Sequence, residues 1–489
     1  MRKKTGKDFL FGGLLFLIVA AGFFFRTFKL AELYSFAHDN DLYSWIVKDI
    51  IVDRHFRLIG QETSVDGIFI GPLFYYLLTP FFVISKMDPL AATYLATIVG
   101  ILTILSFFFV VSSFFNKTTG LIAAFLYACA LPCVFFDRWV VPTQPTMLWS
   151  IWYLYILFSL AEGNLQVLPL AGILLGLVWH VHIALAPLAL LLFLAIKLSG
   201  KKVVLKNLLL PTLFFMIITL PFWLFEIRHN FPQFRGLLLS FYKTPDAARG
   251  FYRLKKVFDQ ASIFLMGNLF PNIKLSSFFN ALPLCFLFWH SLKRKLISPK
   301  KFFLFLAWVI VAIFSQFFSV RPMSEYYFAN ITAVSLPLVA VFLNHFYCAH
   351  KEKAVVLALL LIFFLFNFHQ LRQKSNLPDG YWAKKQLVEY ISQDANVKKY
   401  PCISVNYITR VGNNVGFRYL FWLKKVKVIQ PGKGAPIYNI VMPAAISGKE
   451  VQVVFGNIGL ILPQAANFDN EEICNDPQNQ LLPPLGFVN

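Results

Sequence analysis

The sequence predicts an all-α polytopic membrane protein that ends in a small α/β domain. Hydrophobic residues make up 58% of the 489 residues and charged residues only 14%, which excludes an ordinary soluble domain. Apolar runs of about 20 residues, the length that crosses a bilayer as a helix, recur as far as residue 370. The net charge of +21 comes from Lys and Arg in short clusters between these runs. That pattern is typical of cytoplasmic loops and argues against nucleic acid as a partner.

The apolar runs predict about 11 transmembrane helices. They cover residues 8–25, 89–113, 118–136, 146–161, two short crossings within 166–197, 205–225, 274–292, 301–318, 328–347 and 353–370. The first run has the shape of a signal peptide, but no small-residue cleavage site follows it, so we expect an uncleaved span. Residues 71–85 are apolar but short and carry two prolines. They are expected to form an interfacial or re-entrant helix, although a full crossing stays open.

The basic clusters set the predicted topology, because cytoplasmic loops carry an excess of Lys and Arg. Without a crossing at 71–85, four clusters share one side: Arg2-Lys3-Lys4, Lys197 to Lys206, Lys293 to Lys301, and His350 to Lys353. We therefore expect a multi-pass protein of the cell (inner) membrane with a cytoplasmic N-terminus and an extracytoplasmic C-terminus. A transmembrane domain would cover 1–370, with a first external loop at 26–88, and a second domain would cover 371–489.

Residues 371–489 differ from the rest because their hydrophobic density falls and short strand-like runs appear. The predicted strands are 402–407, 425–429, 438–442 and 451–455, preceded by a helix at about 380–394. Cys402 and Cys474 are the only cysteines of this domain. Since an extracytoplasmic compartment permits disulfides, we expect the two to pair.

An acidic stretch in the first external loop stands out from this apolar chain. Six acidic residues lie between Asp39 and Asp66. Asp39 and Asp41 precede a predicted amphipathic helix, 42–51, which is followed by Arg54, His55 and Arg57. Carboxylates beside cations at a bilayer surface suit a reaction between a lipid-borne anion and a nucleophile that must lose a proton. An ordinary solvated loop is the alternative.

The predicted topology places other polar residues on the same external side. They are Arg138, His180, His182, Arg228, His229, Arg321, Glu325, Tyr326 and Tyr327. External arginines run against the positive-inside bias, and the forked guanidinium suits phosphate oxygens. Each residue also has a structural alternative: Arg138 could pair with Asp137, His182 could be a core histidine, and the tyrosines fit an interfacial belt. His180 and His182 lack the i, i+4 spacing of two metal ligands on one helix face, and no metal site is predicted.

Several blocks together resemble the GT-C membrane glycosyltransferases, specifically bacterial relatives of the dolichyl-phosphate-mannose protein mannosyltransferases (glycosyltransferase family 39) and of the aminoarabinose transferases. The blocks are Asp39-Asn40, LIGQETSVDGIFIGPLFYYLLTP, DRWVVPTQP, GLVWHVHIALAPL, FEIRHNF and EYYF. They follow the family order and cover most of residues 8–345. Asn40 departs from the frequent second acidic residue or Gln, and RWVVPTQP departs from the common Asn-Pro-Asn run.

The resemblance implies transfer of a hexosyl or pentosyl group from a polyprenyl-phosphate donor to a protein, lipid or glycan acceptor outside the cell. Asp39 takes the position of the catalytic acidic residue, with Asp41 as the substitute. Arg138, His182 and Arg228 match donor-pocket positions, and Arg321 is a further candidate for the phosphate. No cofactor is required by the mannosyltransferase type, although oligosaccharyltransferases of the superfamily use a divalent metal. A transporter, flippase or polymerase for lipid-linked glycans, and a non-enzymatic scaffold, remain alternatives.

Overall fold

The computed structural model describes residues 6–63, 67–242, 250–267, 269, 277–319, 323–349, 352–410, 414–446, 451–464 and 468–481. The chain falls into two compact units whose segments alternate along the sequence. Unit 1 contains residues 1–27, 58–74 and 96–373, and unit 2 contains residues 28–57, 75–95 and 374–489. The first part of the acidic stretch, from Asp39 to Asp53, therefore belongs to the same unit as the C-terminal domain, whereas Glu62 belongs to unit 1. The predicted domain boundary between residues 370 and 371 stays a prediction.

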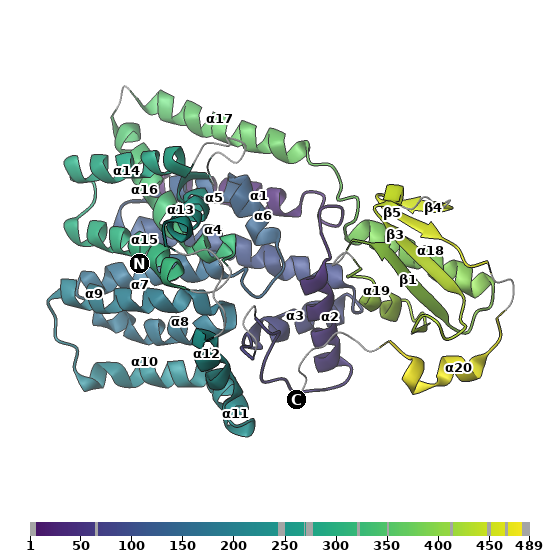
Figure 1. Cartoon of the computed structure of the whole chain (residues 1–489). Coiled ribbons are helices and arrows are strands. Elements are labelled where there is room, and N and C mark those ends of the chain that lie inside the picture. Colours follow the sequence, from purple (N-terminus) through teal and green to yellow (C-terminus); the bar gives the residue numbers. More distant parts are fainter. Residues whose placement is uncertain are drawn as a thin grey trace. The chain divides into compact units, whose positions relative to one another are not determined.

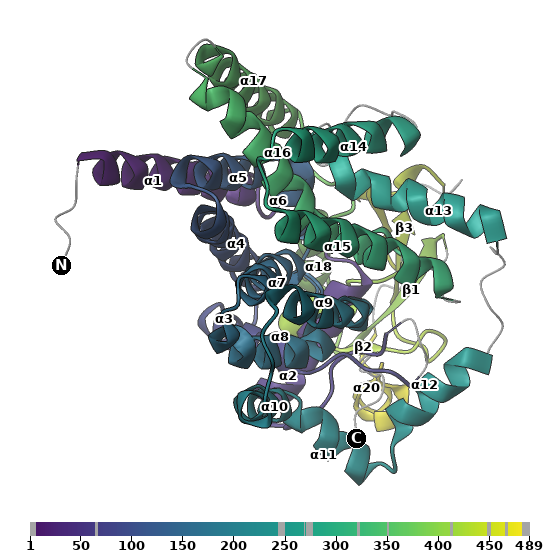
Figure 2. The same ribbon diagram turned by 90° about the vertical axis from the view of Figure 1, so that its left-hand side faces the viewer.

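Unit 1 is helical. Its α-helices are α1 (Gly6–Thr27), α4 (Ala92–Phe114, from residue 96 onward), α5 (Lys117–Cys129), α6 (Leu131–Arg138), α7 (Thr146–Ala161), α8 (Leu168–Val181), α9 (Leu190–Ser199), α10 (Leu205–Ile218), α11 (Leu220–Arg228), α12 (Pro232–Tyr242), α13 (Gly250–Ser262), α14 (Ser277–Lys293), α15 (Pro299–Phe318), α16 (Thr332–Cys348) and α17 (Lys353–Arg372). Short helical turns include η3 (Ile183–Ala189) and η5 (Glu325–Ile331). Helices α8 and α10 run side by side (Figure 1), as do α7, α9 and α15 (Figure 2).

Five described helices are long and apolar enough to cross a membrane, or up to seven if each of two bent pairs is one span. Most predicted spans coincide with helices, but the chain bends within two of them, 118–136 and 205–225. Helices α5 and α6 meet at a bend of 64°, and α10 and α11 at a bend of 58°. In both pairs a proline, Pro132 or Pro221, is the second residue of the second helix. In the first turn its missing N–H costs least, and the helix before it must end. The count of eleven stays a prediction.

Helix α3 (Leu73–Ile84) occupies the short apolar segment whose crossing was left open. At 1.5 Å per residue its 12 residues extend about 18 Å, well short of the roughly 30 Å of a bilayer core. Its length agrees with the interfacial or re-entrant assignment. Helices α8 and α9 are also shorter than a full span, so the two crossings expected within 166–197 stay a prediction.

Unit 2 holds a five-stranded mixed sheet of order β2-β1-β3-β5-β4. The strands are β1 (Ile403–Thr409), β2 (Val428–Ile429), β3 (Ile437–Met442), β4 (Val453–Phe455) and β5 (Ile458–Ile461). Strand β1 pairs in parallel with β2 and β3, while β5 pairs antiparallel with β3 and β4. A two-residue turn joins β4 to β5, and Gly456 there has a φ of +57°, as such tight hairpins require. Strand β5 was not predicted.

Helix α18 (Tyr381–Val397) lies against this sheet (Figure 1), and α19 (Arg418–Leu423) and α20 (Glu471–Asn475) complete the C-terminal part of the unit. The predicted disulfide is confirmed: Cys402, just before β1, is bonded to Cys474 in α20, with the two Cα atoms 5.6 Å apart. Both cysteines lie in a small buried cluster with Ile429 and Ala435. The bond joins residues 72 positions apart and so ties the end of the chain to the sheet.

Candidate functional site

Helix α2 (His38–Ile51) of unit 2 begins before Asp39 and Asp41, whereas the predicted helix began after them, at residue 42. The side-chain Oδ1 of Asn40 accepts a hydrogen bond of 2.9 Å from the backbone N–H of Ala37, so Asn40 caps the helix start. Asn40 is therefore structural at the position where the resembling family often has a second acidic residue. Asp39 and Asp41 both lie in the first turn, where the helix dipole favours negative charge.

The two carboxylates of this turn differ in exposure. Asp39 is half-buried, whereas Asp41 is only 4% exposed. An oxygen of Asp41 accepts a 3.2 Å hydrogen bond from the backbone N–H of Tyr419 in α19. Burial raises the pKa of Asp41 to about 6, while the Tyr419 N–H and the charges of Lys384 and Arg418 act in the opposite direction. Asp41 thus anchors α2 to the C-terminal part of unit 2, and Asp39 is the more accessible carboxylate.

Lys384 in α18 provides a second anchor for the same segment. Its ammonium donates hydrogen bonds of 2.9 Å to the carbonyl oxygens of Phe36 and Val415. A side chain at Gly416, whose φ is +83°, would meet the Phe36 carbonyl at 2.4 Å and Lys384 Nζ at 2.9 Å. Burial lowers the pKa of Lys384 to about 8 against the opposing charges of Asp379 and Asp41. Lys384 and Tyr419 could not be identified as anchors from the sequence, because no local pattern marks a contact made across about 350 residues.

The cations predicted beside the acidic stretch form ion pairs at the far end of α2. Arg57 Nη1 lies 3.0 Å from Asp49 Oδ2, and His55 Nδ1 lies 3.0 Å from the same oxygen. Lys48 and Asp53 form a further pair at 2.7 Å. These contacts stabilise the turn after α2 and occupy two of the six acidic residues.

Unit 1 contains a buried ion pair that could not be identified from the sequence. Arg26, at the end of α1, is fully buried and donates to Asp137 Oδ2 from Nε at 2.8 Å and from Nη2 at 2.6 Å. The hydroxyl of Tyr127 donates to the other oxygen at 2.7 Å. The alternative that Arg138 pairs with Asp137 was therefore wrong. Gly100 leaves room for this pair, because a Cβ there would lie 2.6 Å from Arg26 Nε.

Arg138 follows Asp137 at the end of α6 and borders an aromatic cluster. Its Nη1 lies 3.4 Å from the carbonyl oxygen of Phe25. The next ring, Trp139, has its centroid 5.4 Å from that of Tyr326. His182 lies 5.6 Å from Tyr326 and 4.9 Å from Tyr327, centroid to centroid. The structure thus brings together three predicted residues, His182, Tyr326 and Tyr327, next to the segment that carries Arg138.

His182 has a defined protonation pattern because it caps η3. Its Nδ1 accepts a 3.0 Å hydrogen bond from the Ala184 N–H, so Nδ1 carries no proton and Nε2 is the N–H. His180 uses both ring nitrogens: Nε2 donates to the Ile218 carbonyl at 2.9 Å, and Nδ1 accepts from the Leu73 N–H at 3.4 Å. Gly71 packs directly on its ring. His180 is therefore a packing residue in this structure, whereas His182 offers a donor.

The remaining candidates do not join this cluster in the structure. Arg228 is exposed in the last turn of α11, and His229 donates from Nδ1 to the Phe225 carbonyl at 2.9 Å. Their neighbour Glu226 is fully buried and accepts the N–H groups of Gln233 and Phe234 at the start of α12. Arg321 lies outside the described residues, and so does the side chain of Glu325 at the start of η5.

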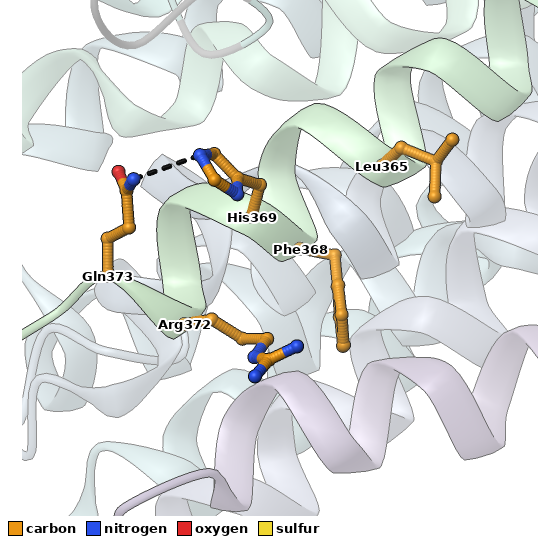
Figure 3. Close-up of a pocket in the computed structure, with 5 residues that line it drawn as sticks. All are labelled: Leu365, Phe368, His369, Arg372 and Gln373. Carbon is orange, nitrogen blue, oxygen red and sulfur yellow. Dashed lines mark hydrogen bonds between the residues drawn. The ribbon is translucent and has the colours of Figure 1, made fainter.

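The cavities of the two units differ in composition. A hollow at the end of α17 is lined by Leu365, Phe368, His369, Arg372 and Gln373 (Figure 3). All five come from one helix and its next residue, so this hollow is a helix surface rather than an enclosed site. Unit 2 holds a smaller, aromatic cavity between α2 and α19. Within the described ranges, no three His, Cys, Asp or Glu side chains gather as metal ligands would.

Comparisons with known proteins give the fold. No protein-family model matches the chain, and no curated protein matches it in sequence. The crystal structure of ArnT from Cupriavidus metallidurans bound to undecaprenyl phosphate aligns with a TM-score of 0.59 at 11% identity, over 94% of this chain and 99% of that one. The apo state of the same protein gives 0.60 at 12% identity, over 92% and 97%.

An archaeal protein has a more distant similarity. The oligosaccharyltransferase of Archaeoglobus fulgidus, in its complex with Zn and sulfate, aligns with a TM-score of 0.50 at 14% identity, over 89% of this chain and 68% of that one. Identities this low show a shared fold and nothing finer. The GT-C fold implied by the sequence blocks is confirmed: this chain is built on the fold of ArnT and of the archaeal oligosaccharyltransferase.

Proposed function

We propose that the chain is an integral membrane glycosyltransferase that transfers a sugar from a polyprenyl-phosphate donor to an acceptor on the extracytoplasmic face. The observation that carries this proposal is the end-to-end fold match to ArnT, which was crystallised with undecaprenyl phosphate. The ordered motif blocks of the sequence support it independently. Each unit carries part of the required chemistry: unit 2 has the accessible carboxylate of Asp39, and unit 1 has Arg138, the donor histidine His182 and aromatic rings.

Asp39 is the proposed general base of an inverting transfer. The acceptor hydroxyl attacks the anomeric carbon of the donor sugar while its proton passes to Asp39. The new bond joins the acceptor oxygen to that carbon, and the bond between the carbon and the phosphate oxygen breaks. The choice of Asp39 over Asp41 follows from geometry, because Asp41 is buried and already bonded to the Tyr419 N–H.

The leaving group is the polyprenyl phosphate, whose negative charge requires positive or N–H donors. Arg138 is the favoured contact, since a guanidinium can fork onto two phosphate oxygens. His182 would donate from Nε2, and Arg228 and Arg321 are further candidates from the sequence. In this scheme the lipid phosphate stores the activation, so no nucleotide is needed. The protein would be multi-pass in the cell membrane with its C-terminal domain outside.

The test begins with the lipid-linked sugar that accumulates in a strain lacking this protein, purified and offered to the full-length protein in lipid nanodiscs. Asp39→Asn keeps the shape of the side chain but removes the proton acceptor. Turnover should fall by about 10²- to 10⁴-fold, while donor binding persists. Asp53→Asn is the matched control, since Asp53 is an exposed acid after the same helix, paired only with Lys48. Normal turnover by Asp39→Asn would remove the proposed base, and accumulation of no lipid-linked sugar would argue against the donor class.

A further inference from the structure

The aromatic cavity of unit 2 is not used by the proposed chemistry. It has a volume of about 210 Å³, and its lining includes Trp45, Tyr407, Arg418, Trp422, Lys427 and Gln480. These residues come from α2, β1, α19 and two connecting segments, so the cavity is enclosed by elements far apart in the sequence. It is smaller than the roughly 300–1,000 Å³ of pockets for drug-sized ligands. Its size suits one compact group.

The walls of the cavity present rigid aromatic rings. The centroids of Trp45 and Trp422 lie 5.9 Å apart with their planes inclined at 53°. Tyr419 packs behind both, 5.5 Å from Trp45 and 5.2 Å from Trp422. Because Tyr419 also donates its backbone N–H to Asp41, the rings are held in place by the contact that anchors α2. Aromatic faces of this kind pack against the C–H face of a sugar ring, and indoles add a polar N–H at the edge.

The polar groups of the cavity are predominantly donors. The indole N–H of Trp45 is buried and has no hydrogen-bond partner within the described part of the chain. A buried donor without an acceptor is costly, but this nitrogen is shielded from the cavity, so the donors that a ligand could reach are those of the other lining side chains. The guanidinium of Arg418 adds positive charge beside Asp41 and Tyr407. The lining therefore suits a ligand with apolar C–H faces and several acceptor oxygens, which describes a saccharide better than an acyl chain.

The place of the cavity along α2 indicates which saccharide. Trp45 follows Asp39 by six residues in one continuous helix, a rise of about 9 Å along the helix axis. A short oligosaccharide spans such a distance. If Asp39 takes the proton of the acceptor hydroxyl, a sugar in this cavity belongs to the acceptor molecule, because one rigid helix then positions both.

We propose that this cavity is a saccharide-binding subsite that holds an acceptor glycan at a sugar unit near the one that receives the new bond. That the bound sugar belongs to the acceptor rests on the proposed function. That the cavity binds a sugar rests on the cavity alone. It selects a glycan among the three acceptor classes, protein, lipid and glycan, that the sequence left open.

Direct binding tests the cavity without turnover. Methyl glycosides of mannose, galactose, N-acetylglucosamine and glucuronic acid are titrated into the full-length protein in nanodiscs, with saturation-transfer NMR as the readout. At least one should bind with a millimolar dissociation constant. Trp422→Ala and Trp45→Ala, which each remove an aromatic wall, should each weaken binding by roughly tenfold. Trp382→Ala is the control, because Trp382 is an exposed indole of α18 outside the lining.

Two results would overturn the proposal: no binding by any of the four glycosides, or equal binding by wild type and both cavity variants with unchanged melting temperatures. A kinetic arm separates this failure from failure of the proposed function. Trp422→Ala should raise KM for a glycan acceptor by more than it lowers kcat, whereas Trp382→Ala should change neither. Asp39→Asn should still bind the glycoside but lose transfer. Retained transfer by Asp39→Asn alongside cavity-dependent binding would contradict the mechanism and leave the sugar site standing.

Discussion

Both units bury carboxylates, and Asp137 of unit 1 and Asp41 of unit 2 are stabilised in different ways. In unit 1, Asp137 faces the fixed charge of Arg26 and the Tyr127 hydroxyl among apolar helices. In unit 2, Asp41 receives a single backbone N–H, and Lys384, the nearby cation, is bonded to two carbonyl oxygens instead. Two buried charges that face each other compensate their desolvation, whereas a carboxylate that faces an amide does so only in part. Arg26 and Asp137 form a fixed ion pair. Asp41 and Lys384, in contrast, have pKa values of about 6 and about 8, close to neutral pH.

The same difference appears in the contacts that lie beside the candidate residues Arg138 and Asp39. The ion pair of unit 1 joins the end of α1 to the end of α6, the residue before Arg138. The hydrogen bonds of unit 2 join Phe36 and Asp41, on either side of Asp39, to α18 and α19. We infer that the helical unit supports its arginine through charge, and the sheet-containing unit supports its acid through the backbone. Three predictions test this contrast.

The largest effect is expected where the fixed pair is broken. Arg26→Met leaves Asp137 as a buried acid without its charged partner, which should cost about 3–5 kcal/mol of stability. The measurement is thermal unfolding of the purified protein in one detergent. Arg26→Met combined with Asp137→Leu should recover most of the loss, since an apolar pair replaces an ionic one. Arg138→Met serves as the control with a small effect. A single variant as stable as wild type would show that the pair does not hold unit 1 together.

A smaller, pH-dependent effect is expected at Asp41. Its folded-state pKa of about 6 lies above the ordinary value of 3.8, so the folded state holds the proton more tightly. Stability should therefore fall as pH rises from about 4 to 6, by at most about 3 kcal/mol. Asp41→Asn keeps the acceptor for Tyr419 but cannot ionise, so its stability should stay level across this window. Melting temperatures at intervals from pH 4 to 7 decide the matter, with Asp53→Asn as control; parallel curves for wild type and Asp41→Asn would refute the assignment.

The smallest effect is expected at Lys384. Lys384→Met removes two hydrogen bonds but also the cost of burying an ammonium, so the net loss should be about 1–2 kcal/mol. Amide hydrogen exchange should rise locally at residues 35–42, ahead of any global unfolding. Because burial lowers the pKa of Lys384 to about 8 from 10.5, wild type should gain stability between these pH values, and the variant should not. Lys398→Met is the control, because it removes an ion pair to Asp394 and a contact with the Tyr400 ring but no bond to residues 35–42. It should leave exchange at 35–42 unchanged, and equal changes in both variants would contradict the anchor.

Much of the fold could be predicted because membrane helices are marked locally. A long apolar run must satisfy its own backbone hydrogen bonds and so becomes a helix wherever it lies. The predicted starts and ends of α7 and α17 agree with the structure within about two residues. The bends at Pro132 and Pro221 were missed because hydropathy counts apolar residues without regard to helix direction. Strand β5 was missed because its four residues carry too little alternation to stand out.

The sequence by itself determined that the chain is built of apolar helices with a small sheet domain and that Cys402 and Cys474 are available to each other, and it named the candidate side chains for the chemistry. These follow from composition and local pattern, since each depends on near neighbours along the chain. Only the tertiary structure decided that Asp137 faces Arg26, that Asp41 is an anchor while Asp39 stays accessible, and that Trp45 and Trp422 enclose a cavity. Those contacts join residues about 110 to 380 positions apart. Burial and partner choice are properties of packing, and no local pattern contains them.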